Sequence, residues 1–234
     1  MNCAPLRPEE GGTLLDWYAA LFPPVMGLCG RKKSEGGLLH RLDFETNGLV
    51  LFAKNQKSLE CLLAQQAEGN FVKEYSAVCR RAEAPPPSFP PLPFCPDICF
   101  SRRDGIARKS FAIESFFRPF GPGRKQVRPI AGTALGKNMR SEIARDRGGF
   151  YRTEIIGASA LDACRFRFAA RLRRGFRHQV RCHLAWIGFP ILNDPLYGEM
   201  RGPSAAGGFL ALSADGLFFD DPKSGRRLEY RIGQ

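Results

Sequence analysis

An aspartate lies in a short polar segment that leads directly into a run of apolar residues. Asp43 belongs to the segment His40–Gly48, and the apolar run Gly48–Ala53 has the length of a strand in the middle of a sheet. A carboxylate on a loop before a buried strand is held rigidly near a low-dielectric interior. That setting suits a nucleophile or a base and calls for a cationic partner. A structural role is the alternative, in which Asp43 caps the turn and Arg41 pairs with it or with Glu45.

A second polar cluster lies in Gly175–Leu184, where we expect a short helix over His178–Ile187 that ends at Gly188 and Pro190. His178, Arg181 and Ala185 share one stripe of this helix, beside an apolar stripe, so Arg181 can reach inward. A helix that is merely basic explains the pattern equally well.

A third segment, Gly188–Gly198, has the composition of a turn-rich loop. It contains an acid, Asp194, and an aromatic hydroxyl, Tyr197. A structural role accounts for both side chains.

The elements that position these residues follow from apolar periodicity. Ser58–Gly69 predicts a helix, because Leu59, Leu62 and Leu63 recur at helical spacing before a glycine. Alternating patterns predict strands, and Arg165 and Arg167 fall on the outer face of one of them. These strands are Val72–Cys79, Cys164–Ala170, Phe209–Asp220 and Arg226–Ile232. Strands and helices without regular alternation predict an α+β fold, with a mixed, mainly antiparallel central sheet and flanking helices.

The 234 residues carry a net charge of +12 and a pI near 9.7, which favours a polyanionic partner, nucleic acid before membrane. Residues 101–147 hold 12 basic and 4 acidic side chains, and residues 165–181 hold seven arginines and no acid. This preference for arginine points to phosphate contact, although a solvated surface explains any single residue. No apolar run is long enough to span a bilayer, and no secretory signal is evident, so we expect a cytoplasmic protein.

The eight cysteines are scattered, and we expect them to be reduced and mostly buried. Cys95 and Cys99 form the only close pair. His178, Cys182 and His183 are neighbours but lack an obvious fourth ligand, so we expect no metal.

Seven prolines within residues 85–96 predict a stiff, extended connection between an N-terminal part, about 1–84, and a C-terminal part, about 101–234. Glycine-rich stretches between residues 119 and 149 mark a loop-rich middle.

Four segments together resemble the RluA-type RNA pseudouridine synthases. His40-Arg-Leu-Asp43, then Thr46, Gly48-Leu49 and Ala53-Lys54, is similar to H-R-L-D-x-x-T-S-G-L-L-L-x-A-K. Lys73-Glu-Tyr75-Ser-Ala77 is similar to K-x-Y-x-A. Gly175–Leu184 and Gly188–Gly198 are similar to G-R-T-H-Q-I-R-V-H-L and G-x-P-I-x-G-D-x-x-Y-G. Order and spacing agree over roughly residues 38–80 and 150–232.

The resemblance implies the pseudouridine synthase catalytic fold over residues 38–234, after a divergent N-terminal segment 1–37. It implies isomerisation of uridine to pseudouridine in RNA without a cofactor. Asp43 matches the catalytic aspartate, Tyr75 the aromatic that stacks on the uracil, and Arg181 the basic partner of the aspartate. Arg41 matches the arginine beside the flipped nucleotide. The remaining residues expected to bind substrate or RNA are His40, Arg177, His178, Arg165, Arg167 and Arg173.

The sequence departs from the family pattern in the second cluster, where Phe176-Arg177 stands in place of Arg-Thr. Asn47 replaces a serine or threonine, and the early K-P-x-G strand is not evident in residues 1–37. The alternative is therefore an inactive RNA-binding protein on the same scaffold. The expected partner is ribosomal or transfer RNA, and a monomer is the default.

Overall fold

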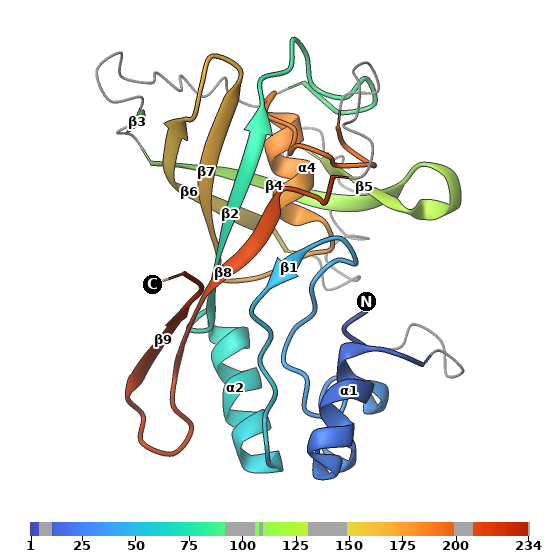
Figure 1. Cartoon of the computed structure of the whole chain (residues 1–234), viewed down its shortest axis with the longest axis vertical. Coiled ribbons are helices and arrows are strands. Elements are labelled where there is room, and N and C mark those ends of the chain that lie inside the picture. Colours follow the sequence, from blue (N-terminus) through green and yellow to red (C-terminus); the bar gives the residue numbers. More distant parts are fainter. Residues whose placement is uncertain (5–10, 92–105, 108–109, 131–148, 199–207, 234) are drawn as a thin grey trace. The chain divides into compact units, whose positions relative to one another are not determined.

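The computed structural model describes residues 1–4, 11–91, 106–107, 110–130, 149–198 and 208–233. These residues form two compact units (Figure 1). Unit 1 comprises residues 1–74 and 213–234, and unit 2 comprises residues 75–212. None of the helices in this described part of the chain is both long and apolar enough to cross a membrane.

Unit 1 contains the N-terminal helices and the two ends of the chain. Its helical elements are α1 (Leu14–Leu21), the 3-10 turns Pro23–Gly27 and Lys33–Glu35, and α2 (Gln56–Glu68). Its strands are β1 (Asn47–Gly48), β9 (Arg227–Arg231), nearly all of β8 (Leu212–Asp220) and the first residues of β2 (Val72–Arg80). In Figure 1 the cyan helix α2 runs alongside the red β8–β9 hairpin. Gln65 of α2 donates to the backbone carbonyl of Asp220 and accepts from the backbone N–H of the same residue, both at 2.8 Å.

Both long helices of unit 1 begin at a side-chain cap. The Thr13 hydroxyl accepts from the backbone N–H of Asp16, and the Asp16 carboxylate accepts from that of Thr13, which is a capping box. The hydrogen bonds that the Asp16 carboxylate accepts from the backbone N–H and the hydroxyl of Thr13 lower the pKa of Asp16. Helix α2 starts at the Asn55 side chain and ends at Gly69, whose φ of 78° places it in the left-handed region that glycine favours. The predicted helix over 58–69 is confirmed and starts two residues earlier.

Unit 2 is built on a sheet with the order β2-β7-β6-β4-β5, and the short β3 pairs with β6. The pairs β7–β6, β6–β4 and β4–β5 are antiparallel. The strands that follow β2 are β3 (Ile106–Ala107), β4 (Phe111–Phe120), β5 (Gln126–Ile130), β6 (Tyr151–Ala160) and β7 (Arg165–Leu172). Helix α4 (Gln179–Trp186) packs across β5 and β6 (Figure 1). The pairing of β1 with β8 is parallel, whereas the β3–β6, β4–β5, β4–β6, β6–β7 and β8–β9 pairs are antiparallel. The predicted mixed, mainly antiparallel α+β fold is therefore confirmed.

The expectation of a central strand over Gly48–Ala53 is wrong. Only Asn47–Gly48 pairs with a strand, and Phe52 forms a single bridge with Leu38. Leu49 and Leu51 pack against one hydrophobic cluster, while Val50 and Phe52 pack against another. The run is therefore apolar on both sides because it separates two clusters of unit 1.

Helix α4 is buried on every side. All eight of its residues are buried, including Arg181 and His183. The predicted helix over His178–Ile187 is confirmed within one residue at each end. The apolar members of α4 join β2 and β7 in the main core of unit 2, which includes Ala77, Phe168 and Leu184.

Candidate active site

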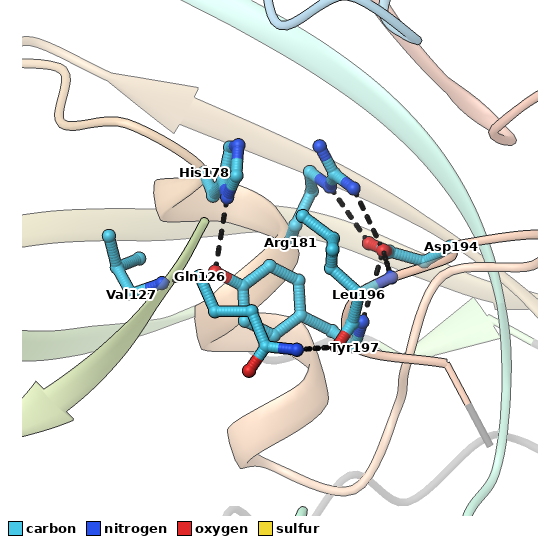
Figure 2. Close-up of polar contacts among 7 residues, drawn as sticks. All are labelled: Gln126, Val127, His178, Arg181, Asp194, Leu196 and Tyr197. Carbon is cyan, nitrogen blue, oxygen red and sulfur yellow. Dashed lines mark hydrogen bonds and ion pairs between the residues drawn. The ribbon is translucent and has the colours of Figure 1, made fainter. Parts of the chain in front are cut away.

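Arg181 is held inside unit 2 by a carboxylate from the loop after α4. Its Nε donates to Asp194 Oδ2 and its Nη2 donates to Asp194 Oδ1, both at 2.9 Å (Figure 2). The side chains of both residues are 0% exposed. A two-point bond fixes the guanidinium plane, because the fork of donors matches the carboxylate oxygens. A guanidinium has five N–H donors in one plane, and Asp194 takes those on the Nε/Nη2 side.

Asp194 also closes its own loop. Its Oδ1 accepts from the backbone N–H groups of Leu196 at 2.9 Å and Tyr197 at 3.1 Å, and its carbonyl accepts from Gly198 N–H at 3.1 Å. A Cβ on Gly198 would lie 2.5 Å from that carbonyl oxygen, so only glycine fits there. The loop is thus built around the acid that binds Arg181.

Tyr197 connects this loop to the start of α4. Its hydroxyl oxygen accepts from the backbone N–H of Val127 at 2.7 Å and lies 3.1 Å from His178 Nδ1 (Figure 2). Burial raises the pKa of Tyr197, so the hydroxyl keeps its proton and can donate it to Nδ1. His178 itself has a φ of 56°, a left-handed conformation that is uncommon outside glycine. This strained backbone is held at the residue that begins the helix carrying Arg181.

His183 belongs to a buried polar network rather than to a metal or substrate site. Its Nε2 lies 2.9 Å from Ser115 Oγ, and its Nδ1 lies 2.8 Å from Thr153 Oγ1. Gln179 also donates to Thr153 Oγ1, at 3.1 Å. Burial lowers the pKa of His183 to about 3, so the ring is neutral at physiological pH. The network fixes α4 to β4 and β6.

Tyr75 is the first residue of unit 2 and lies on β2. It is partly buried and packs against the same core cluster as Val180 and Leu184 of α4. Ala77 and Cys79, also in that cluster, continue its face of the strand, as the alternation predicts. Tyr75 and the helix that carries Arg181 therefore share one core.

Asp43 lies in unit 1, in a turn that is fixed on both sides. The Asp43 carbonyl accepts from Thr46 N–H at 2.9 Å. Before the turn, the backbone N–H of Leu42 donates to Cys3 Sγ at 3.2 Å. After it, Gly48 passes so close to β8 that a Cβ would lie 2.4 Å from the carbonyl oxygen of Ala214. Asp43 is itself half-buried, which suits a carboxylate that must meet a substrate.

Two neighbours of Asp43 differ sharply in exposure. His40 is buried and packs against Phe71 with ring centroids 5.6 Å apart. Burial, with a further contribution from Lys73, lowers the pKa of His40 to about 3, so its ring is neutral. Arg41 is exposed, and its Nη1 forms an ion pair with Glu35 Oε1 at 3.5 Å. The direct contact with RNA expected for His40 and Arg41 stays a prediction.

The other predicted RNA-binding arginines lie on the surface of unit 2. Arg165, Arg167 and Arg173 are exposed, and the outward alternation of Arg165 and Arg167 on β7 is confirmed. Arg165 is held by an ion pair with Asp162. Arg177 donates to the carbonyl oxygens of Arg124 at 2.7 Å and Gln126 at 3.1 Å, so it supports the β4–β5 turn. Phe176, at the departure from the family pattern, stacks on Phe117 with ring centroids 5.1 Å apart.

The thiols of the described residues are less buried than expected, since Cys3, Cys79 and Cys182 are buried but Cys29 and Cys164 are exposed. Six cysteines lie there, all as free thiols, and Cys95 and Cys99 fall outside the described residues. Burial and the Asp194 charge raise the pKa of the Cys79 and Cys182 thiols, so neither is a thiolate nucleophile. Within the described ranges, no three His, Cys, Asp or Glu side chains are grouped to hold a metal ion.

Sequence reasoning missed the role of Asp194. It treated the acid as a structural member of a loop, without assigning its partner. An acid that precedes a proline inside a turn-rich loop gives no local sign that it binds an arginine 13 residues earlier. The available signals were the short separation between the helix and the following loop, and the acid in the family motif that Gly188–Gly198 resembles.

Comparison with known proteins identifies the family. The family model described as RNA pseudouridylate synthase matches residues 29–186, which include Asp43, Tyr75 and Arg181. The chain belongs to the RNA pseudouridylate synthase family. It is 28% identical over 228 residues to an uncharacterized RNA pseudouridine synthase of Bacillus subtilis, covering 96% of this chain and 61% of that protein.

Other relatives of this RNA pseudouridylate synthase family member carry more specific names. The ribosomal large subunit pseudouridine synthase D of Zymomonas mobilis is 28% identical over 206 residues, covering 83% of this chain and 51% of that protein. The solved structure of human RNA pseudouridylate synthase domain containing 1 matches with a TM-score of 0.60 at 18% identity, covering 95% of this chain and 74% of that one. The chain thus has the family's fold and spans about half to three fifths of these curated bacterial relatives.

Proposed function

We propose that this protein converts uridine to pseudouridine at specific sites in structured RNA. The observation that carries the proposal is the buried, doubly bonded guanidinium of Arg181, within a family match that also spans Asp43 and Tyr75. A permanently charged guanidinium whose plane is fixed by two hydrogen bonds is suited to orient a carboxylate that takes part in the reaction.

Asp43 acts on the nucleoside in the proposed reaction. Its carboxylate promotes cleavage of the bond between C1′ and N1, either by attack on the sugar or through a glycal intermediate. The detached uracil turns and is rejoined to C1′ through C5, which then loses its proton, while N1 gains one. Atoms balance within the nucleotide, so the reaction needs no cofactor, and the pocket must hold the free base throughout.

Tyr75 and Arg181 assist Asp43. Tyr75 stacks on the uracil and is the candidate for removing the C5 proton. In the proposal, the Nη1/Nη2 side of Arg181 pairs with Asp43 and orients its carboxylate. Asp194 is the positioning residue for this pair, because it fixes the guanidinium plane from the opposite edge. Residues 38–234 form the catalytic domain in this proposal.

The substrate uridine must leave its helix before reaction, at a cost of a few kcal/mol. Phosphate contacts supply that free energy, and the net charge of +12 suits them. Arg41 fills the vacated stack, and Arg165, Arg167, Arg173, Arg177 and His178 lie along the RNA. The names of several relatives favour ribosomal RNA, with transfer RNA as the alternative substrate. We extend the proposal to a cytoplasmic monomer.

RNA from cells that lack the protein provides the test. It is incubated with wild type or with Asp43→Asn, and new pseudouridines are mapped as carbodiimide adducts. Wild type should create adducts at one or a few uridines, and Asp43→Asn should create none while binding the same RNA. RNA binding by wild type without any new adduct would instead identify an RNA-binding protein on this scaffold.

A further inference from the structure

The side chain next to Asp43 is an exposed aromatic ring. Phe44 is 64% exposed, although it lies in the turn that the Asp43 carbonyl and Thr46 N–H close. The six phenylalanines of unit 1 are all described, and the other five, Phe22, Phe52, Phe71, Phe218 and Phe219, are buried or half-buried. The exposed exception, Phe44, directly follows Asp43 in the chain, so their Cα atoms lie about 3.8 Å apart.

The ring is presented by a fixed backbone. The backbone N–H of Leu42 donates to Cys3 Sγ at 3.2 Å, and the backbone N–H of Leu49 donates to the Ala214 carbonyl at 2.9 Å. Gly48 has no room for a side chain against the same carbonyl. A residue at the tip of a turn held on both sides meets a ligand without first being ordered, so little conformational entropy opposes binding.

Extrusion of one nucleotide leaves its neighbours with an unstacked face. An exposed aromatic ring can replace the lost stacking, and every base offers a π-face to it. Isolated exposed apolar residues are common and carry no meaning alone. Phe44 differs because its turn is closed by backbone hydrogen bonds and because it is adjacent to the proposed nucleophile, where the RNA must approach.

We propose that Phe44 is the stacking platform for a base that flanks the extruded uridine. This inference rests on the proposed function and adds a substrate contact to it. Phe44 stacks on a neighbouring base, whereas Arg41, two residues before Asp43, fills the position that the extruded base leaves. Because stacking strength rises with ring area, Phe44 favours a purine at the flanking site.

Two short single-stranded RNAs test the proposal by binding alone. One has a single uridine between two adenosines, and the other has abasic sites in place of those adenosines, so the phosphate charge is equal. Phe44→Ala should bind the first RNA at least about fivefold more weakly than wild type does and should bind the second equally well. Leu21→Ala, which removes an apolar side chain of unit 1 that is 66% exposed, is the matched control and should change neither.

A fluorescence readout reports the stack itself. The chain has two tryptophans, the exposed Trp17 and the buried Trp186. In a Trp17→Phe background, Phe44→Trp supplies one exposed indole, and the adenosine-flanked RNA should quench it more than the abasic RNA does. Equal quenching, equal loss of affinity for both RNAs, or no measurable binding overturns the proposal. Failure of wild type to make pseudouridine in cellular RNA, with the stacking intact, would refute the proposed enzyme and leave the Phe44 contact standing.

Discussion

The carboxylate of Asp194 accepts two hydrogen bonds from the guanidinium of Arg181 in the interior of unit 2. Removing one member of a buried ion pair leaves the other charge uncompensated, which costs about 3–5 kcal/mol. The pair therefore links the stability of the loop after α4 to the orientation of the residue that we propose as the partner of the catalytic acid.

Asp194→Asn should lower the free energy of unfolding by about 3–5 kcal/mol, because it leaves Arg181 buried without its acid. Urea unfolding followed by circular dichroism measures the change. Asp220→Asn is the matched control, since it breaks the exposed Asp220–Arg227 pair and should cost about 0–1 kcal/mol. Equal effects of the two substitutions would contradict a special role for the buried pair.

Mild acid should weaken the fold through two buried histidines. The pKa values of His40 and His183 are about 3 in the folded protein, below the ordinary 6.5 of the unfolded chain. As the pH falls from 6.5 toward 3, the unfolded chain binds more protons, so the free energy of unfolding falls by at most about 1.4 kcal/mol per pH unit for each histidine. This stabilisation is fully present above pH 6.5.

His183→Gln removes one of these two titrations. Urea unfolding between pH 5 and pH 6.5 should show a shallower pH dependence for this variant than for wild type. Asp16, Asp162 and Asp221 have lowered pKa values and act only at more acidic pH, so they do not disturb this window. Parallel curves for the two proteins would mean that His183 is not held neutral.

Gly48→Ala should destabilise unit 1 and disturb the turn that carries Asp43. The new Cβ would meet the Ala214 carbonyl oxygen at 2.4 Å, and the φ of 128° is unfavourable for alanine. Gly27→Ala, with nothing within 4 Å and no positive φ, is the control and should leave stability within about 0.5 kcal/mol of wild type. Thermal unfolding and pseudouridine formation both serve as measurements, and an unperturbed Gly48→Ala would show that β8 can move aside.

Arg167→Ala should reduce affinity for unfractionated transfer RNA and reduce the slope of log affinity against log salt by about one. Arg167 is exposed between the buried Phe166 and Phe168, so its charge is presented outward from β7. Arg165→Ala should have a smaller effect, because Asp162 already pairs with Arg165. An unchanged slope in Arg167→Ala would mean that this face of β7 does not meet RNA.

Local sequence patterns correctly predicted the elements that have one buried face and one exposed face. The spacing of Leu59 and Leu62 was sufficient to predict α2, because one face of the helix is buried and Gly69 ends the helix. The alternation in β7 was sufficient because one face of the strand is buried and the other is exposed. Cys164, expected to continue that buried face, is instead exposed just before the strand.

Tertiary context decided what local patterns could not. The Gly48–Ala53 run is apolar because it borders two clusters, a situation that has the same sequence pattern as a central strand. For Arg181, two acids were available in the sequence, Asp43 and Asp194, and a sequence pattern does not rank partners in space. The structure identifies Asp194 as one partner, and the pairing with Asp43 stays a prediction.

The hydrogen bond from the Leu42 backbone N–H to Cys3 Sγ ties Cys3 to the loop that leads to Asp43. Alkylating that sulfur would therefore release an anchor that lies 39 positions from Leu42 in the sequence, and would loosen the loop before Asp43 without touching the acid itself.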